Sequence, residues 1–254
     1  MKQIPNLFTL LNLFLGCIAI VFMMQNGITI YASADGSQLL DMPEKIWMAS
    51  LFIGIAAVVD FLDGFIARLF NASSEMGKQL DSLADVVSFG VAPGMIIYQF
   101  LRLSIAQEEN GIDASILSLV PAFILPCAAA YRLARFNLDP VKSPNFKGVP
   151  VPAVGMVVAS LPLIYWNADQ VWVRELLLNK WFLYAFIALL SFLMVSTLPM
   201  LGFKFTNLKS RENYPRYLLI AIAVLAAVFL HWLAVPVVFI AYVLVSLLFK
   251  NKIA

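Results

Sequence analysis

The sequence predicts an all-α membrane protein, a polytopic bundle of about eight transmembrane helices. Its 254 residues are 62% hydrophobic and only 13% charged, and the mean hydropathy is +0.88. Soluble domains are nearer half apolar and a quarter charged, so an ordinary water-soluble globule is excluded. The apolar residues are gathered into long runs, and Lys and Arg are concentrated on alternate connections between those runs. A run of roughly 20 such residues crosses a bilayer core.

Eight apolar runs have lengths that fit this requirement. They cover residues 5–25, 46–70, 80–103, 114–136, 151–168, 181–201, 214–233 and 234–250. The last two are separated by a very short turn between His231 and Pro236, and a proline in the first turn of a new helix fits that position. The first run is long and lacks a small-residue cleavage site, so we expect no cleavable signal sequence.

The distribution of positive charge predicts the orientation, because Lys and Arg are concentrated on the cytoplasmic side of membrane proteins. Eight spans place both termini on one side. If that side is the cytosol, thirteen of the seventeen Lys and Arg residues lie inside and four, Lys45, Arg102, Arg174 and Lys180, lie outside. We therefore expect an integral protein of the cell membrane with both termini in the cytoplasm.

Composition also limits the chemistry. The net charge of +2 is too small to indicate a nucleic-acid partner. Cys17 and Cys127, the only cysteines, lie inside apolar runs, so neither a disulfide framework nor a zinc cluster is indicated. His231 is the only histidine, which excludes sites with several histidine ligands. A metal in this protein would have to be held by oxygen ligands.

Four aspartates stand at the cytoplasmic ends of the second and third runs, where ionisable side chains are costly. Residues three or four apart share a helix face, so Asp60 lies beside Asp63 and Asp81 lies beside Asp85. The short connection between the two runs makes these helices antiparallel neighbours, and the four carboxylates are expected to converge. Four like charges at close range need compensation, and oxygen-only ligands favour Mg²⁺, Mn²⁺ or Ca²⁺.

Small residues accompany the acids. Gly64 and Ala67 leave one helix face without bulk, and Arg68 adds a fixed cation that suits phosphate oxygens. Carboxylate-held metal ions, an arginine and a bare helix surface fit a nucleotide diphosphate. The reaction indicated is a phosphoryl-type transfer in which a carboxylate activates a hydroxyl.

The pattern Asp60-x2-Asp63-Gly64-x2-Ala67-Arg68-x8-Gly77-x3-Asp81-x3-Asp85 resembles, position for position, the signature of the CDP-alcohol phosphatidyltransferases. The resemblance implies that the four aspartates hold a pair of divalent ions, Mg²⁺ or Mn²⁺ with Ca²⁺ able to take their place. It implies that Asp85 is also the general base. It implies a homodimer, and a family core over residues 1–200 that the helix pair in 201–254 extends within the same membrane domain.

The flanking segments resemble the branch of that family that transfers a phosphatidyl group from CDP-diacylglycerol to L-serine. These segments are residues 4–12, 89–93, 130–137 and 146–153. The residues implied to bind CDP-diacylglycerol are Asn6, Thr9, Asp60, Gly64, Ala67, Arg68 and Gly77. An amino acid brings a carboxylate and an ammonium, so its pocket needs a cation and an acceptor, and the residues expected there are Arg132, Arg135, Asn137 and Lys147.

Several alternatives stay open. The same chemistry with glycerol 3-phosphate or inositol phosphate as acceptor also needs a cationic pocket. A carboxylate-based ion or proton transporter also carries acids in its spans, although nearer the bilayer midplane. Arg132 and Arg135 are also explained as cytoplasmic anchors, and Asn6 and Thr9 as caps of the first helix.

Overall fold

The structure is a computed structural model of the chain. It describes residues 4–25, 29–32, 38–42, 44–69, 74–108, 115–139, 146–202 and 210–249. The helices are α1 (Ile4–Gln25), α2 (Trp47–Leu69), α3 (Glu75–Asp85), α4 (Ala92–Ala106), α5 (Ile124–Leu138), α6 (Val151–Asn167), α7 (Val171–Leu177), α8 (Lys180–Val195), α9 (Ser210–Leu230) and α10 (Ala234–Leu248). The strands are β1 (Thr29–Ala32), β2 (Gln38–Asp41), β3 (Phe146–Lys147) and β4 (Pro199–Met200).

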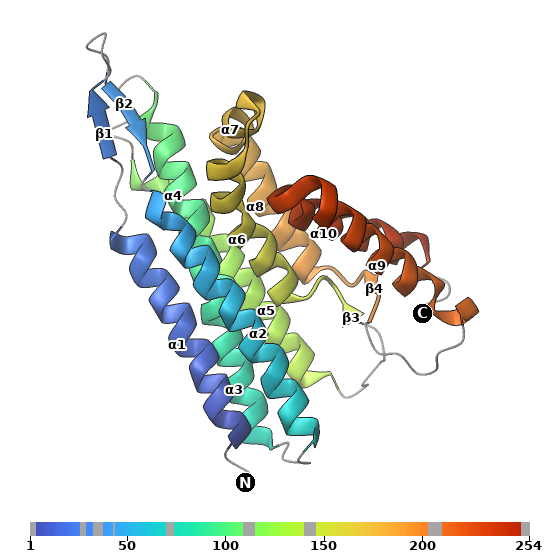
Figure 1. The fold of residues 1–254 in the computed structure, drawn as a ribbon. Coiled ribbons are helices and arrows are strands. Elements are labelled where there is room, and N and C mark those ends of the chain that lie inside the picture. The colour runs from blue at the N-terminus through green and yellow to red at the C-terminus, as the bar shows by residue number, and fades with distance from the viewer. Residues whose placement is uncertain are drawn as a thin grey trace.

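Most helices run along one elongated bundle (Figure 1). Helix α1 packs along α2 and α3, α5 packs on α8, and α6 contacts α2 and α4. The described N-terminal end of α1 lies with α3 and the last turns of α2 at one end of the bundle, and β1, β2 and α7 lie at the other end (Figure 1). Helices α9 and α10 pack against each other and extend from the side of the bundle (Figure 1).

The chain is a helical membrane protein. Among the described residues, four stretches are long and apolar enough to cross a membrane: Pro5–Gln25, Trp47–Ile66, Glu75–Ala106 and Asn213–Leu248. The pair α7 and α8, bent by 66°, forms a fifth if it is taken as one span. Helix α6 is apolar but shorter, at 17 residues. These helices match predicted runs in the sequence, but the count of eight spans is not confirmed.

The last apolar stretch is divided at His231, as the short turn in the sequence predicts. His231 has a φ of +48°, in the left-handed region, and it begins a single 3₁₀ turn before α10. A continuous helix cannot pass through such a backbone conformation. The turn therefore folds α10 back onto α9.

Two short strand pairs add to the predicted all-α architecture. Strands β1 and β2 form an antiparallel pair between α1 and α2, with Thr29 opposite Asp41. Strands β3 and β4 pair the segment before α6 with the segment after α8, with Phe146 opposite Met200. Both pairs lie in connections, where β-branched and aromatic residues such as Ile30 and Tyr31 favour an extended backbone.

A π-helical segment, Val86–Val91, joins α3 to α4 directly after Asp85. The amide of Ala92 donates to the carbonyl of Val87, five residues back. Pro93 has no amide hydrogen and is commonly found where the regular helix pattern is broken. Such wide turns are frequent at functional sites.

Candidate metal and substrate site

Three of the four predicted aspartates come together between α2 and α3. The carboxylates of Asp60, Asp81 and Asp85 each offer an oxygen that lies within 4.8 Å of the other two. Asp60 is contributed by α2, and the other two lie one turn apart on α3. The i, i+4 spacing puts both α3 side chains on the face toward α2. Helix α3, which carries two of them, lies at the end of the bundle where α1 begins (Figure 1).

Asp63 lies beside this group but is turned toward α1. It is one turn beyond Asp60 on α2, it is buried, and its Oδ2 accepts a hydrogen bond from the hydroxyl of Thr9. Asp63 is still close enough for its charge to repel those of Asp60 and Asp81. The expected convergence of four carboxylates is therefore a group of three with a fourth anchored at its edge.

The charges in this group are poorly compensated by the protein. Asp85 and Asp63 are both only 7% exposed, and Asp60 and Asp81 are half-buried. Among the described side chains, no lysine or arginine makes a salt bridge to these aspartates; the ion pairs present are Lys147–Asp139 and Lys180–Glu108. Buried carboxylates that repel one another are stable as anions only beside a cation.

Helix α1 contributes a polar stripe that faces the aspartates. Thr9, Asn12 and Gly16 follow each other at helical spacing. The amide Nδ2 of Asn12 donates to Oδ1 of Asp85 at 3.4 Å, and Ser88 Oγ donates to the backbone carbonyl of Asn12 at 2.9 Å. Asn12 stands in the N-terminal segment that resembles the serine branch, but it is not among the residues predicted to bind a substrate. Its position three residues after Thr9, on the same helix face, is a signal that could have identified it.

The predicted nucleotide-binding residues on α2 and α3 differ in their surroundings. A Cβ on Gly77 would lie 3.0 Å from Oδ1 of Asn6, so the missing side chain lets the start of α1 approach α3. A Cβ on Gly64 would meet no described atom within 4 Å, as expected for a bare helix face. Ala67 and Arg68 belong to α2, and their side chains lie outside the described residues.

Arg132 is the predicted serine-binding residue that the structure brings toward the aspartates. It is 5% exposed on α5, and its charge attracts that of Asp85. Its Nε is buried and has no hydrogen-bond partner in the part of the chain that the structure describes. A buried guanidinium with an unused donor is suited to an anionic ligand.

The other three predicted serine-binding residues are engaged by the protein. Arg135 donates from Nη1 to the carbonyl of Val195 at 2.6 Å and from Nη2 to that of Ser196 at 3.0 Å, at the end of α8. The Asn137 amide donates to Ser82 Oγ at 2.7 Å, and the exposed Lys147 pairs with Asp139 at 2.7 Å. Arg135 thus satisfies carbonyls that a helix end leaves without partners.

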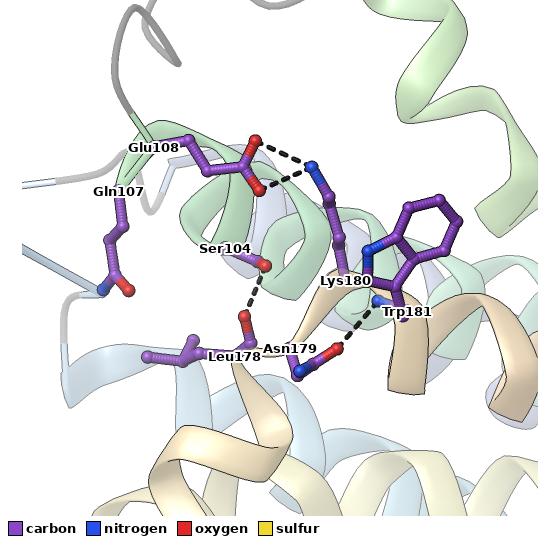
Figure 2. A pocket seen from close by; sticks show the side chains of 7 residues that line it. All are labelled: Ser104, Gln107, Glu108, Leu178, Asn179, Lys180 and Trp181. Atoms are coloured by element: carbon purple, nitrogen blue, oxygen red, sulfur yellow. Dashed lines mark hydrogen bonds and ion pairs between the residues drawn. The ribbon is translucent and has the colours of Figure 1, made fainter.

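A separate pocket of about 440 Å³ lies between the end of α4 and the turn from α7 to α8 (Figure 2). Lys180 pairs with Glu108 across it at 2.6 Å, and Asn179 accepts from the amide of Trp181 at 2.9 Å (Figure 2). Its charged groups are already paired with each other. None of the residues predicted to bind metal or substrate lines it.

Comparisons with known proteins identify relatives of this chain. The family model for CDP-alcohol phosphatidyltransferase matches residues 2–198. The CDP-diacylglycerol–serine O-phosphatidyltransferase of Helicobacter pylori is 33% identical over 220 residues, which cover 86% of this chain and 78% of that protein. The enzyme of the same name from Bacillus subtilis is 39% identical over 127 residues, covering 48% of this chain and 63% of that protein.

The yeast protein of that name, from Saccharomyces cerevisiae, is 35% identical over 155 residues, 52% of each chain. The matches to the Bacillus and yeast proteins thus span less than two thirds of those relatives' length. The family match covers well over half of the present chain and includes all four aspartates of the site. The chain belongs to the CDP-alcohol phosphatidyltransferase family.

Proposed function

We propose that this protein is a membrane enzyme that transfers the phosphatidyl group of CDP-diacylglycerol to the hydroxyl of L-serine, giving phosphatidylserine and CMP. The observation that carries the proposal is the group formed by Asp60, Asp81 and Asp85 in a chain of this family. The choice of serine is supported by the names of the relatives from Helicobacter and Bacillus.

The carboxylate group fits divalent cations. Mg²⁺ holds oxygens at about 2.0–2.1 Å and Ca²⁺ at about 2.3–2.6 Å, so oxygens on opposite sides of one ion are roughly 4–5 Å apart. The three aspartates have that dimension, within 4.8 Å of one another, and all their ligand atoms are oxygens. We propose that Asp60, Asp63, Asp81 and Asp85 hold two ions, Mg²⁺ or Mn²⁺. Bound there, the ions supply positive charge that neutralises the diphosphate.

The chain's own residues then position the reaction. Asp85 takes the proton of the serine hydroxyl, and the serine oxygen forms a bond to the lipid-side phosphorus. The bond from that phosphorus to the bridging oxygen breaks, and CMP leaves with that oxygen. The hydrogen bond from Asn12 holds one oxygen of Asp85, which leaves the other free to act as base. No covalent enzyme intermediate is needed, because the attacking nucleophile is the substrate itself.

Substrate binding divides between the two sides of this group. We propose that CDP-diacylglycerol lies along α1, α2 and α3, against the residues Asn6, Thr9, Asp60, Gly64, Ala67, Arg68 and Gly77. We propose that Arg132 binds the serine carboxylate, and that Arg135 supports the pocket by holding the end of α8. Asn137 and Lys147 stay predicted contacts of serine. To bind it, they would have to leave their present partners, Ser82 and Asp139.

The arrangement in the membrane is also part of the proposal. We propose eight spans, with both termini in the cytoplasm. They are α1, α2, the α3–α4 stretch, α5, α6, α8, α9 and α10. We propose a core over residues 1–200 and an added pair of spans in 201–254 of the same membrane domain. The site then faces the cytosol at the border of the cell membrane, where it can meet a lipid and a water-soluble amino acid. A homodimer is proposed from the family resemblance.

The test is an assay of the purified protein with CDP-diacylglycerol and Mg²⁺. L-Serine, glycerol 3-phosphate and inositol phosphate are supplied in parallel, and lipid products and CMP are measured by mass spectrometry. We expect phosphatidylserine and equimolar CMP from serine alone. A product from one of the other alcohols would overturn the choice of acceptor. Cation uptake into sealed vesicles without CMP release would instead favour a transporter.

A further inference from the structure

Five buried side-chain atoms have no hydrogen-bond partner among the described residues. They are Asn12 Oδ1, Ser50 Oγ, Arg132 Nε, Trp166 Nε1 and Ser191 Oγ. Buried polar atoms are nearly always paired, so each exception asks for an explanation. Two of the five belong to residues that interact with Asp85: Asn12 through its hydrogen bond and Arg132 through its charge.

These two unpaired atoms are opposite in character. Nε of Arg132 carries a hydrogen and can only donate, whereas Oδ1 of Asn12 can only accept. A free α-amino acid brings the complementary pair, a carboxylate that accepts and an ammonium that donates. The two side chains come from α5 and α1, on different elements around Asp85. A ligand that contacts both atoms would lie beside the carboxylate proposed as the base.

The orientation of the Asn12 amide follows from its neighbour. With Nδ2 toward Asp85 a donor meets an anion, while the flipped amide would place two acceptors against each other. Oδ1, attached to the same carbon, is then left without a partner among the described residues. The residue is 0% exposed, and Ser88 fixes its backbone carbonyl at 2.9 Å.

We propose that Asn12 binds the serine substrate. Its Oδ1 accepts a hydrogen bond from the ammonium of serine, while its Nδ2 orients Asp85. The inference rests on the proposed function and extends it, because it assigns the recognition of the ammonium to α1. It also explains a preference for an amino acid over a phosphorylated polyol. An alcohol without an ammonium would leave Oδ1 of Asn12 unpaired, and sites with an unpaired buried group reject such ligands.

The test measures the kinetic parameters of Asn12→Leu and Asn12→Asp in the full-length purified protein. Asn12→Leu removes the oxygen that would accept the hydrogen bond from the serine ammonium. We expect the KM for serine to rise about tenfold or more, with the KM for CDP-diacylglycerol unchanged. Asn12→Asp keeps an acceptor oxygen but loses the donor to Asp85. We expect it to keep the KM for serine within about threefold and to lower kcat.

Equilibrium binding of radiolabelled serine, in the presence of Mg²⁺ and CMP, supplies a second measurement that needs no turnover. Asn12→Leu should weaken this binding by the same factor. Ser50→Ala is the matched control, since it removes another buried unpaired atom ten residues before Asp60, about 15 Å along α2. The control should leave serine binding and both KM values unchanged.

Each contrary outcome has a distinct meaning. An unchanged KM and unchanged binding of serine in a folded Asn12→Leu protein would overturn the inference and leave the proposed function intact. A raised Mg²⁺ requirement with an unchanged KM for serine would also overturn it, because Oδ1 would then be a metal ligand. If the unaltered protein makes no phosphatidylserine, the proposed function itself fails. Should Asn12→Leu not fold, Asn12→Asp decides: a rise of tenfold or more in its serine KM contradicts the inference.

Discussion

The hydroxyl of Ser88 donates a hydrogen bond to the backbone carbonyl of Asn12 at 2.9 Å, and so joins the π-helical segment to α1. The contact depends on Gly16, because a Cβ there would lie 2.4 Å from Ser88 Oγ. Since Ser88 follows Asp85 by one helical turn, the same contact sets how the carboxylate of Asp85 faces α1. The position of the proposed base is therefore fixed by two helices rather than by α3 alone.

This close approach predicts that Gly16→Ala is destabilising. The added methyl group would overlap Ser88, and overpacking of this kind lowers the free energy of unfolding by about 1–3 kcal/mol. Gly54→Ala on α2 is the control, because its Cβ would meet no described atom within 4 Å. Alanine there should be neutral or stabilise by up to about 1 kcal/mol. Thermal unfolding in detergent measures both, and equal midpoints would contradict the packing described.

Asp85→Asn should abolish transfer while the protein stays folded. The substitution keeps the shape of the side chain but removes the base, and loss of a general base lowers kcat by roughly 10²–10⁴. Asp169→Asn is the control, because Asp169 is exposed in the turn between α6 and α7, and α7 lies at the other end of the bundle. Turnover is measured as CMP release, and near-normal turnover of Asp85→Asn would remove Asp85 from the role of base.

Chelation should stop the reaction. EDTA is expected to abolish CMP release, and Mg²⁺ or Mn²⁺ added in excess should restore it, because the ligands are all oxygens. Asp81→Asn should raise the Mg²⁺ concentration needed for half-maximal rate at least several-fold, since a charged ligand is lost. Glu108→Gln, in the pocket at the α7–α8 turn, should leave it unchanged. Activity that persists in EDTA would contradict the metal assignment.

Arg132→Ala should change the KM for serine, whereas Arg135→Ala should change mainly the stability of the protein. Loss of Arg132 removes the proposed carboxylate partner, so the KM for serine should rise about 10- to 100-fold. Loss of Arg135 leaves the carbonyls of Val195 and Ser196 without their donor. This should lower the free energy of unfolding by about 1–2 kcal/mol, with little selective change in the KM for serine. Steady-state kinetics and thermal unfolding separate the two, and identical profiles would return both residues to a role as cytoplasmic anchors.

The convergence of Asp60, Asp81 and Asp85 could be predicted because it depends on local rules. Helical spacing places two of them on one face, and the short connection keeps α2 and α3 at the same end of the bundle, where both pack on α1. The bare helix face at Gly64 could be predicted for the same reason, because it depends only on the residue at that position. The turn at His231 was also evident, since two apolar runs met with almost no connection between them.

The contacts that refine the site could not be predicted, because they join distant parts of the chain. Thr9 and Asp63 are 54 residues apart, Asn12 and Asp85 are 73 apart, and Arg135 is 60 from Val195. No periodicity within a helix reports which face of α1 meets α3, or that an arginine will bind the carbonyls at the end of another helix. The same limit applies to the pairing of β3 with β4.

Anomalous diffraction from crystals grown with Mn²⁺ locates the proposed metal ions. We expect a manganese peak between α2 and α3, about 2–2.5 Å from carboxylate oxygens of Asp60, Asp81 and Asp85, and no such peak in Asp81→Asn crystals grown at the same concentration. Fully occupied manganese elsewhere, with these three carboxylates left without an ion, would contradict it.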